Sequence, residues 1–223
     1  STSTNVSLFR NQSVSRTIAF ALSQTLTAGN TPSSVAVGDF DQDGRIDLVV
    51  ANAGSNNVQV FRNKSVTGSI SLALSATLTG LGTPTSVAIG DFNGDGFLDI
   101  AVANNGSNTV RVFQNNAVSS SIGFNGGLTI TVGTAPSSIA LGDLDGDGYP
   151  DIVAANTTSN STSVLRTSAT GTLSFTTNLD ISGASATAAS GLVVGDFNAD
   201  GWPDIVAATS GSSNNVAVFI QNV

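Results

Sequence analysis

The sequence of 223 residues contains no cysteine, histidine, methionine or glutamate. Without cysteine no disulfide can form, so cysteine usage carries no information about the redox compartment. Without histidine, cysteine and glutamate, the usual general bases and activated nucleophiles are missing. The sequence therefore predicts a protein that is not an enzyme.

Positive charge and long apolar runs are also scarce. Six arginines and Lys64 are scattered along the chain and form no basic patch, which argues against nucleic-acid binding. No apolar run approaches the roughly 18 residues of a membrane-spanning helix, so no membrane span is expected. Charged residues make up only 10% of the chain, while 40% of the residues are hydrophobic, enough for a substantial core.

The acidic residues, in contrast, are concentrated. All 15 are aspartates, and every one except Asp180 lies in one of four nine-residue loops with the pattern D-x-[DN]-x-D-G-x-x-D. The first to fourth loops are residues 39–47, 91–99, 143–151 and 196–204. The net charge of −8 comes almost wholly from these loops, which indicates a local purpose for the carboxylates.

That purpose is predicted to be calcium binding, with one ion in each loop and about four in all. Ca²⁺ takes six to eight oxygen ligands. Side-chain oxygens at positions 1, 3 and 5 converge on one point, because glycine at position 6 permits the sharp turn. Position 7 offers its backbone carbonyl, and the aspartate at position 9 completes the coordination shell of the ion. The predicted ligands are Asp39, Asp41, Asp43, Arg45 and Asp47; Asp91, Asn93, Asp95, Phe97 and Asp99; Asp143, Asp145, Asp147, Tyr149 and Asp151; and Asp196, Asn198, Asp200, Trp202 and Asp204.

Three other interpretations of the loops are weaker. An EF-hand needs glutamate at position 12 and flanking helices, neither of which is present here. Magnesium demands near-octahedral geometry and keeps its waters. A metal-free Asp/Gly turn is disfavoured by four copies of closely spaced carboxylates, which repel one another when unpaired.

The loops recur at steps of 52, 52 and 53 residues, and the repeat extends beyond them. A short apolar strand is expected before each loop and another after it, both covered on two faces, then an alternating third strand and a fourth strand. Four strands in about 50 residues, with no helical periodicity, predict an all-β fold, a β-propeller of about four blades with four antiparallel strands each. The second residue of each loop (Phe40, Phe92, Leu144, Phe197) is predicted to anchor the loop to the core. Inter-blade packing is favoured over sugar stacking for Tyr149 and Trp202.

The predicted organisation is a single domain, residues 1–223, with repeats at about 34–85, 86–137, 138–190 and 191–223. Residues 5–11 match a third strand and residues 18–26 a fourth. The N-terminal strands, 5–27, are therefore expected either to close the last blade or to pair with a neighbouring molecule. A piece of a longer propeller is the remaining alternative.

The loops and their flanks resemble the FG-GAP/VCBS repeat of integrin-α-like, calcium-binding β-propellers. The resemblance rests on [VIL]-x-x-G-D-[FL] before each loop and D-[IL]-[VA]-[VA]-A after it, and it covers nearly the whole chain. It implies a propeller with one Ca²⁺ per loop in a secreted or cell-surface protein. Family propellers commonly have seven blades, whereas about four repeats are present here.

The favoured function is an extracellular calcium-stabilised propeller that serves as a structural, adhesive or assembly module. Its expected partners are a protein or glycan at the cell surface or in the matrix, and a second copy paired through a spare edge strand. Free calcium outside the cell suits loops of about 10⁻⁴–10⁻³ M affinity. The alternative is a lectin-like, carbohydrate-binding propeller.

Overall fold

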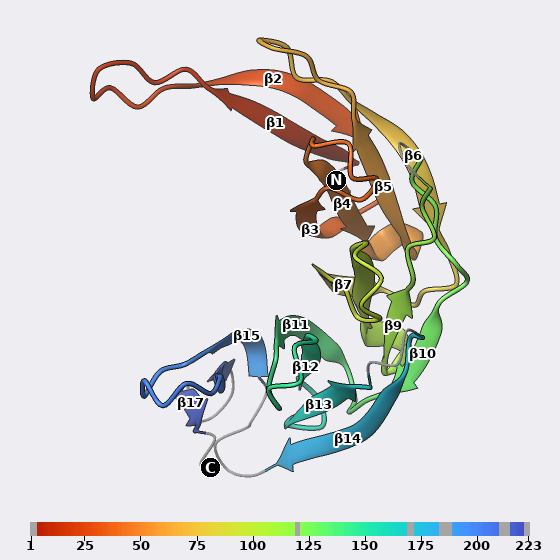
Figure 1. Ribbon diagram of the computed structural model, residues 1–223, viewed down its shortest axis with the longest axis vertical. Coiled ribbons are helices and arrows are strands. Elements are labelled where there is room, and N and C mark those ends of the chain that lie inside the picture. Colours follow the sequence, from red (N-terminus) through yellow and green to blue (C-terminus); the bar gives the residue numbers. More distant parts are fainter. Residues whose placement is uncertain (1–3, 119–120, 169–171, 183–188, 210–214, 221–223) are drawn as a thin grey trace.

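The computed structural model describes residues 4–118, 121–168, 172–182, 189–209 and 215–220. Within these residues the chain is all-β, with two short 3-10 turns, η1 (Ala53–Ser55) and η2 (Asn105–Ser107). Five antiparallel sheets follow one another along a C-shaped arc (Figure 1). In this part of the chain no helix has the length and apolar character needed to cross a membrane.

Three of the sheets have four strands in sequence order, one has two and one has three. The N-terminal sheet is β1 (Asn5–Asn11) and β2 (Phe20–Thr27). The first repeat forms β3 (Pro32–Gly38), β4 (Asp47–Asn52), β5 (Asn57–Asn63) and β6 (Leu72–Leu78). The second forms β7 (Pro84–Gly90), β8 (Asp99–Asn104), β9 (Thr109–Phe113) and β10 (Leu128–Thr131). The third forms β11 (Pro136–Gly142), β12 (Asp151–Asn156), β13 (Ser161–Thr167) and β14 (Phe175–Ser182), and the fourth β15 (Ala189–Gly195), β16 (Asp204–Thr209) and β17 (Val216–Phe219).

Each aspartate loop joins the first two strands of its repeat. Gly38 pairs with Asp47 in the first sheet and Gly90 with Asp99 in the second, so the last residue of each loop is the first residue of a strand. The same pairing recurs in the third and fourth sheets. The repeat therefore places all four loops at the same end of their sheets.

The second strand of a repeat is the most deeply buried. All six residues of β4, β8 and β12 are buried. The prediction that the first strand would also be covered on both faces is wrong for β3, where Val35 and Val37 are 56% and 59% exposed. The first strands lie side by side on the inner side of the arc (Figure 1). Among the described residues β3 packs against only one other first strand, β7, whereas β7 and β11 each pack between two, so one face of β3 stays exposed.

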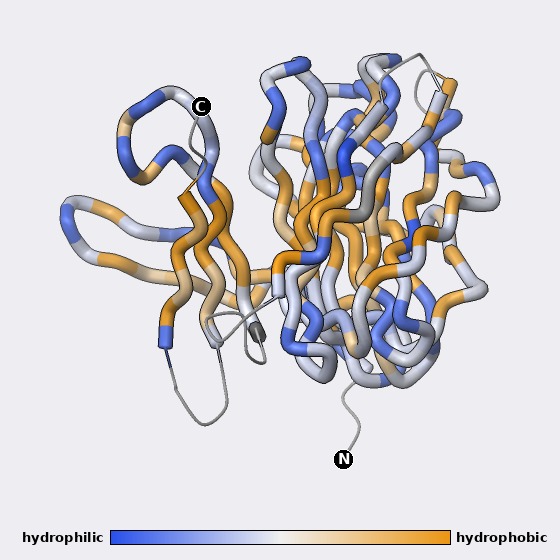
Figure 2. The backbone as a smooth tube through the Cα atoms, turned by 90° about the horizontal axis from the view of Figure 1, so that it is seen from below, coloured by the Kyte–Doolittle hydropathy of each residue, from blue (hydrophilic) through white to orange (hydrophobic). Residues whose placement is uncertain are grey.

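The core lies between successive sheets. Phe40, Val49 and Val60 of the first repeat form one cluster with Ile100 and Val102 of the second. A second cluster joins the second and third repeats, and a third joins the N-terminal hairpin to the first repeat. Figure 2 shows the same pattern along the chain, with hydrophobic colours concentrated in the strands and hydrophilic colours at the turns. Face-to-face packing of neighbouring sheets therefore holds the arc together.

The arc does not close into a ring within the described residues. The N-terminal strands β1 and β2 pair with each other, and β15–β17 form a separate three-stranded sheet. One of the two alternatives from the sequence was that the N-terminal strands complete the last blade. In the described residues they do not. They cover the first sheet instead, because Leu26 and Ala28 pack with Leu48, Val50 and Phe61. Pairing with a neighbouring molecule stays a prediction.

Candidate metal centre

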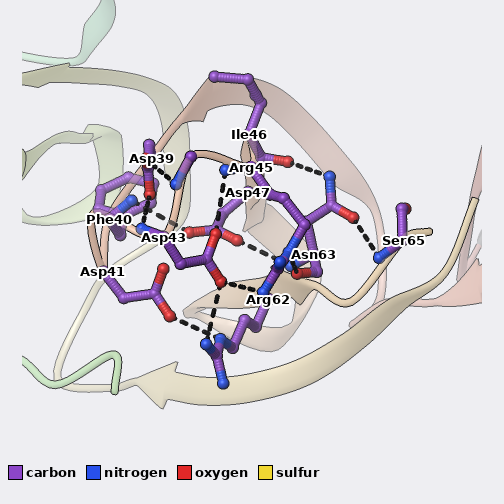
Figure 3. A network of polar contacts seen from close by, with 11 residues as sticks. Asp39, Phe40, Asp41, Asp43, Arg45, Ile46, Asp47, Arg62, Asn63 and Ser65 are labelled. Atoms are coloured by element: carbon purple, nitrogen blue, oxygen red, sulfur yellow. Dashed lines mark hydrogen bonds and ion pairs between the residues drawn. The ribbon is translucent and has the colours of Figure 1, made fainter. Parts of the chain in front are cut away.

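The first loop is folded by hydrogen bonds from its own backbone to its carboxylates (Figure 3). Asp39 accepts bonds from the backbone N–H groups of Asp43 (3.1 Å) and Gly44 (2.8 Å). Asp43 accepts a bond of 3.0 Å from the N–H of Arg45. Closely spaced aspartates are thus turned toward the inside of one tight loop, because each satisfies backbone donors that a sharp turn leaves free.

The other three loops repeat these bonds. The carboxylate at position 1 accepts from the N–H groups at positions 5 and 6, at 2.8–3.2 Å, in the loops that begin at Asp91, Asp143 and Asp196. The carboxylate at position 5 accepts from the N–H of Phe97, Tyr149 or Trp202 at 2.9 Å. The predicted role of the position 7 carbonyl as a ligand stays a prediction.

Two positions of each loop have left-handed backbone. Glycine at position 6 has φ between +83° and +92° in Gly44, Gly96, Gly148 and Gly201, as the sequence predicts. Position 4 also has positive φ, including +55° at Gln42 and +61° at Ala199, where the residue is not glycine. This second turn was not predicted, although glycine at position 4 of the second and third loops was a signal for it.

The aspartate at position 9 is buried and holds the loop to the sheet. Oδ2 of Asp47 accepts a 3.0 Å bond from the N–H of Phe40, and Oδ1 accepts a 2.7 Å bond from the N–H of Asn63. Asp99 and Asp151 make the equivalent pairs of bonds, and Asp204 accepts from the N–H of Phe197 at 3.0 Å. Position 9 therefore bridges the loop and the end of the third strand. Each bonded oxygen keeps a second lone pair for a further donor or a cation.

Burial dominates the ionisation of these position 9 carboxyls. It raises the pKa of Asp99 to about 7 and that of Asp151 to about 6, against the lowering effect of the backbone N–H donors and with a smaller contribution from neighbouring aspartates. Burial also raises the pKa of Asp47. For Asp43, burial acts upward, but the N–H of Arg45 and the guanidinium groups of Arg62 and Arg45 outweigh it and lower the pKa.

Arginine side chains contact two of the loops. These contacts were not predicted, because the arginines are scattered along the sequence. In the first loop, Nε of Arg62 lies 2.6 Å from Oδ2 of Asp41, as an ion pair rather than an aligned hydrogen bond, and Nη2 lies 3.0 Å from Oδ2 of Asp43 (Figure 3). Arg45 also pairs with Asp43, and Arg166 pairs with Asp145 in the third loop.

The residues fit a hard cation. Asp39, Asp41 and Asp43 have carboxylate oxygens within 4.8 Å of one another, and so do Asp143, Asp145 and Asp147. The position 9 aspartates are not in these two groups. The buried Oδ1 of Asp41 has no hydrogen-bond partner in this part of the structure, and a buried carboxylate oxygen is costly without one. An all-oxygen donor set of this kind suits Ca²⁺.

The side chains at position 2, and the aromatic rings at position 7 of the third and fourth loops, act in packing. Phe40 and Phe92 are fully buried, as predicted, whereas Phe197 is 56% exposed because no later sheet covers it among the described residues. A methyl group added to Gly94 would lie 2.6 Å from Cε1 of Tyr149, and one added to Gly146 would lie 2.9 Å from Cζ3 of Trp202. Each ring therefore lies against the loop of the preceding repeat, so these two aromatic side chains pack between repeats.

Comparison with known proteins identifies the repeat. Of the solved structures, one similar to this chain is described as a functionally unknown protein from Desulfotomaculum acetoxidans DSM 771, with a TM-score of 0.61, 17% identity, and coverage of 98% of this chain and 62% of that one. Another is BBS1N in complex with ARL6DN, soaked with lead, with a TM-score of 0.50, 13% identity, and coverage of 78% and 50%. This chain thus spans less than two thirds of either structure, and at such identities the likeness concerns the fold.

No curated protein sequence matches the chain significantly. A family profile described as the FG-GAP-like repeat matches four times, at residues 1–50, 39–102, 91–154 and 143–207. FG-GAP repeats are typical of extracellular proteins, and the family is generally non-enzymatic. These overlapping matches run through most of the sequence, and the chain belongs to the FG-GAP-like repeat family.

Proposed function

We propose that this chain is an extracellular β-propeller module whose blades are stabilised by one calcium ion in each aspartate loop. The observation that carries the proposal is the convergence of three carboxylates in the first loop, with a buried Oδ1 on Asp41 that lacks a hydrogen-bond partner among the described residues. Calcium supplies positive charge to a cluster of carboxylates that otherwise repel one another. Free energy of binding at a folded loop is also free energy of folding.

The residues that would hold each ion are those predicted from the pattern. In the first loop they are the carboxylates of Asp39, Asp41, Asp43 and Asp47 and the backbone carbonyl of Arg45. Asp47 is tied to the sheet by two backbone N–H groups, so a cation there would fasten the loop to the second strand and to the end of the third. The equivalent positions serve in the other three loops.

The module has a structural or adhesive role, which it fulfils by assembling with other copies or by binding another protein. The low-charge sequence, rich in Ser, Thr, Asn and Gly, contains no basic cluster and lacks the usual catalytic residue types. The FG-GAP family match supports a protein-interaction module. Partners would be a protein or glycan outside the cell, or a second copy.

The aromatic residues considered for sugar stacking do not favour the carbohydrate-binding alternative. Tyr149 and Trp202 lie against the preceding loops. One hollow of about 520 Å³ is lined largely by aliphatic side chains such as Val6, Leu8 and Val37. A glycan array tests this alternative directly, and specific retention of one sugar class would support it.

The calcium assignment is tested by counting ions and by melting. Native mass spectrometry in millimolar calcium is expected to find about four bound ions, and excess chelator is expected to lower the melting temperature by about 10 °C, because several metal sites are lost together. Equal concentrations of magnesium serve as the control and should restore little of the loss. An unchanged melting curve in chelator would contradict the assignment. Light scattering with and without calcium then separates a monomer from an assembly.

A further inference from the structure

The four loops fall into two classes that alternate along the chain. Position 3 is aspartate in the first and third loops (Asp41 and Asp145) and asparagine in the second and fourth (Asn93 and Asn198). The third strand supplies an arginine to the two loops that have aspartate at position 3, the aspartate class. The two loops with asparagine at position 3 form the asparagine class. The two classes therefore differ by a pair of opposite charges.

Strand register identifies the matching positions on the third strand. Phe61, Phe113, Leu165 and Phe219 are paired with the residue that follows position 9 in their own repeat. The next residue along the chain is Arg62, Gln114, Arg166 and Ile220, respectively. An arginine thus stands at this position only in the first and third repeats.

In the aspartate class, the guanidinium relieves repulsion inside the loop. Arg62 lies 2.6 Å from Asp41 and 3.0 Å from Asp43, so it bridges the carboxylates at positions 3 and 5 (Figure 3). Arg166 pairs with Asp145 at the third loop. Carboxylates this close repel when unpaired, and a planar guanidinium is suited to hold two of them.

In the asparagine class, an amide has the same role from within the loop. Nδ2 of Asn93 donates a 2.8 Å hydrogen bond to Oδ2 of Asp95. Nδ2 of Asn198 donates a 2.7 Å bond to Oδ2 of Asp200. Position 3 is therefore an internal donor where it is asparagine and an arginine-paired acceptor where it is aspartate.

The pairing also makes the loops similar in charge. Four aspartates and Arg166 give the third loop a formal charge of −3, the same as the three aspartates of the second or fourth loop. The first loop, with Arg62 and Arg45 against four aspartates, carries −2. Without the arginine of its third strand, each aspartate-class loop would be one unit more negative.

We propose that Arg62 and Arg166 are internal counter-cations that hold the calcium affinity of the four-aspartate loops down to the level of the three-aspartate loops. The same arginines keep these loops folded when calcium is absent. Arg62 contacts Oδ2 of Asp41, while Oδ1 lacks a partner among the described residues, so the carboxylate can be shared with a cation. A fixed positive charge beside the site opposes a second cation. This inference rests on the proposed calcium binding.

The test uses Arg62→Gln and Arg166→Gln, with Arg10→Gln as the matched control. Arg10 occupies the same place in β1 and donates to the carbonyl of Gly68, 2.7 Å away. Calcium titration by calorimetry is expected to show one site in each arginine variant bound about tenfold more tightly than in the parent. The effect should be larger for Arg62, because its side chain is 22% exposed against 53% for Arg166 and is less screened.

A charge transplant into the second loop tests the same idea from the other side. Asn93→Asp alone is expected to create one tighter calcium site and to lower the melting temperature in chelator. Adding Gln114→Arg should reverse both changes. The inference is overturned if calcium binds normally but these variants leave every affinity within about twofold of the parent.

Failure of the proposed function would look different. If the parent protein binds no calcium, the calcium assignment falls. The melting temperature in chelator then still tests the counter-cation, because Arg62→Gln leaves Asp41 buried and without its ion pair and should lower it by several degrees. An Arg62→Gln melting temperature equal to that of the parent in chelator would contradict the counter-cation role.

Discussion

Nδ2 of Asn115 donates a 2.8 Å hydrogen bond to the backbone carbonyl oxygen of Phe40, a residue 75 positions earlier in the chain. Asn115 follows the third strand of the second repeat, and Phe40 is position 2 of the first loop. The same amide donates to the carbonyl of Leu98 at 3.1 Å, so one buried side chain joins two neighbouring loops. The first and second loops are therefore linked by a side chain that follows the third strand of the second repeat.

Asn115→Ala is expected to destabilise the protein by about 2–3 kcal/mol, because it leaves the buried carbonyl of Phe40, the partly buried carbonyl of Leu98 and the N–H of Ala117 without their partner. The matched control is Asn63→Ala. Asn63 donates to Ile46 at 2.8 Å as Asn115 does to Leu98, but it makes no bond of this kind to an earlier loop among the described residues. Chemical denaturation measures both, and equal losses would show that the cross-loop bond contributes little.

Gly94→Ala is expected to be more destabilising than Gly148→Ala, although both residues have positive φ, +74° and +90°. Strain at such a backbone costs alanine about 1–2 kcal/mol in either loop. At Gly94 the new methyl group also meets Tyr149, at 2.6 Å, whereas nothing among the described residues lies within 4 Å at Gly148.

Tyr149→Ala in the Gly94→Ala background isolates that contact. Thermal melting of the double variant should show that Tyr149→Ala costs less there than in the parent, because the clash is relieved along with the packing. Additive losses would mean that the ring does not press on the preceding loop.

Much of the fold could be predicted because the same loop pattern and flanking apolar strands recur four times in the sequence. The loop pattern located Asp39, Asp91, Asp143 and Asp196, and the apolar runs after the first three loops became fully buried second strands. Local hydrogen bonding within nine residues fixes the loop, so the glycine at position 6 was informative on its own. Position 9 was predicted as a ligand. Its bond to the end of the third strand was not predicted, because it joins residues 16 positions apart that meet only when the second and third strands pair.

The contacts between repeats could not be predicted from the sequence. The exposed face of Val35 and Val37 depends on which sheets neighbour β3, and the pairing of β1 with β2 rather than with the last sheet depends on how the arc is formed. The arginine contacts lie within one repeat but were also missed, because Arg62 and Asp41 are separated in the sequence and meet only through strand register. Comparing position 3 with the third strand across the four repeats would have suggested the pairing.

Asp95→Ala is expected to remove one calcium ion and leave the other three bound, because each loop draws its proposed ligands from its own nine residues. Asp180→Ala is the control, since Asp180 is the only aspartate outside the loops. Native mass spectrometry at millimolar calcium counts the ions directly. Loss of every ion in Asp95→Ala would argue for one cooperative site shared among loops.

In chelator, the protein is expected to become more stable as the pH falls from about 8 to about 5. The pKa of Asp99 is raised to about 7 and that of Asp151 to about 6 in the folded state, above the ordinary value of 3.8. At a pH between the ordinary pKa and the raised pKa of each carboxyl, the folded state binds more protons than the unfolded state. Stability is therefore lost as the pH rises through the folded-state pKa. A tenfold change in the acid dissociation constant of a carboxyl corresponds to about 1.4 kcal/mol before solvent screening. The two carboxyls together therefore predict a rise of several degrees in melting temperature.

Calcium should reverse this dependence, since binding requires the charged carboxylates and weakens as they gain protons. Melting curves at several pH values, with calcium and with chelator, measure both slopes. Asp99→Asn and Asp151→Asn lower stability by removing an acceptor, but they should flatten the slope in chelator because the titrating group is gone. A metal-free protein that loses stability between pH 7 and pH 5 would show that these buried carboxyls are already charged, held so by the backbone N–H groups that bind them.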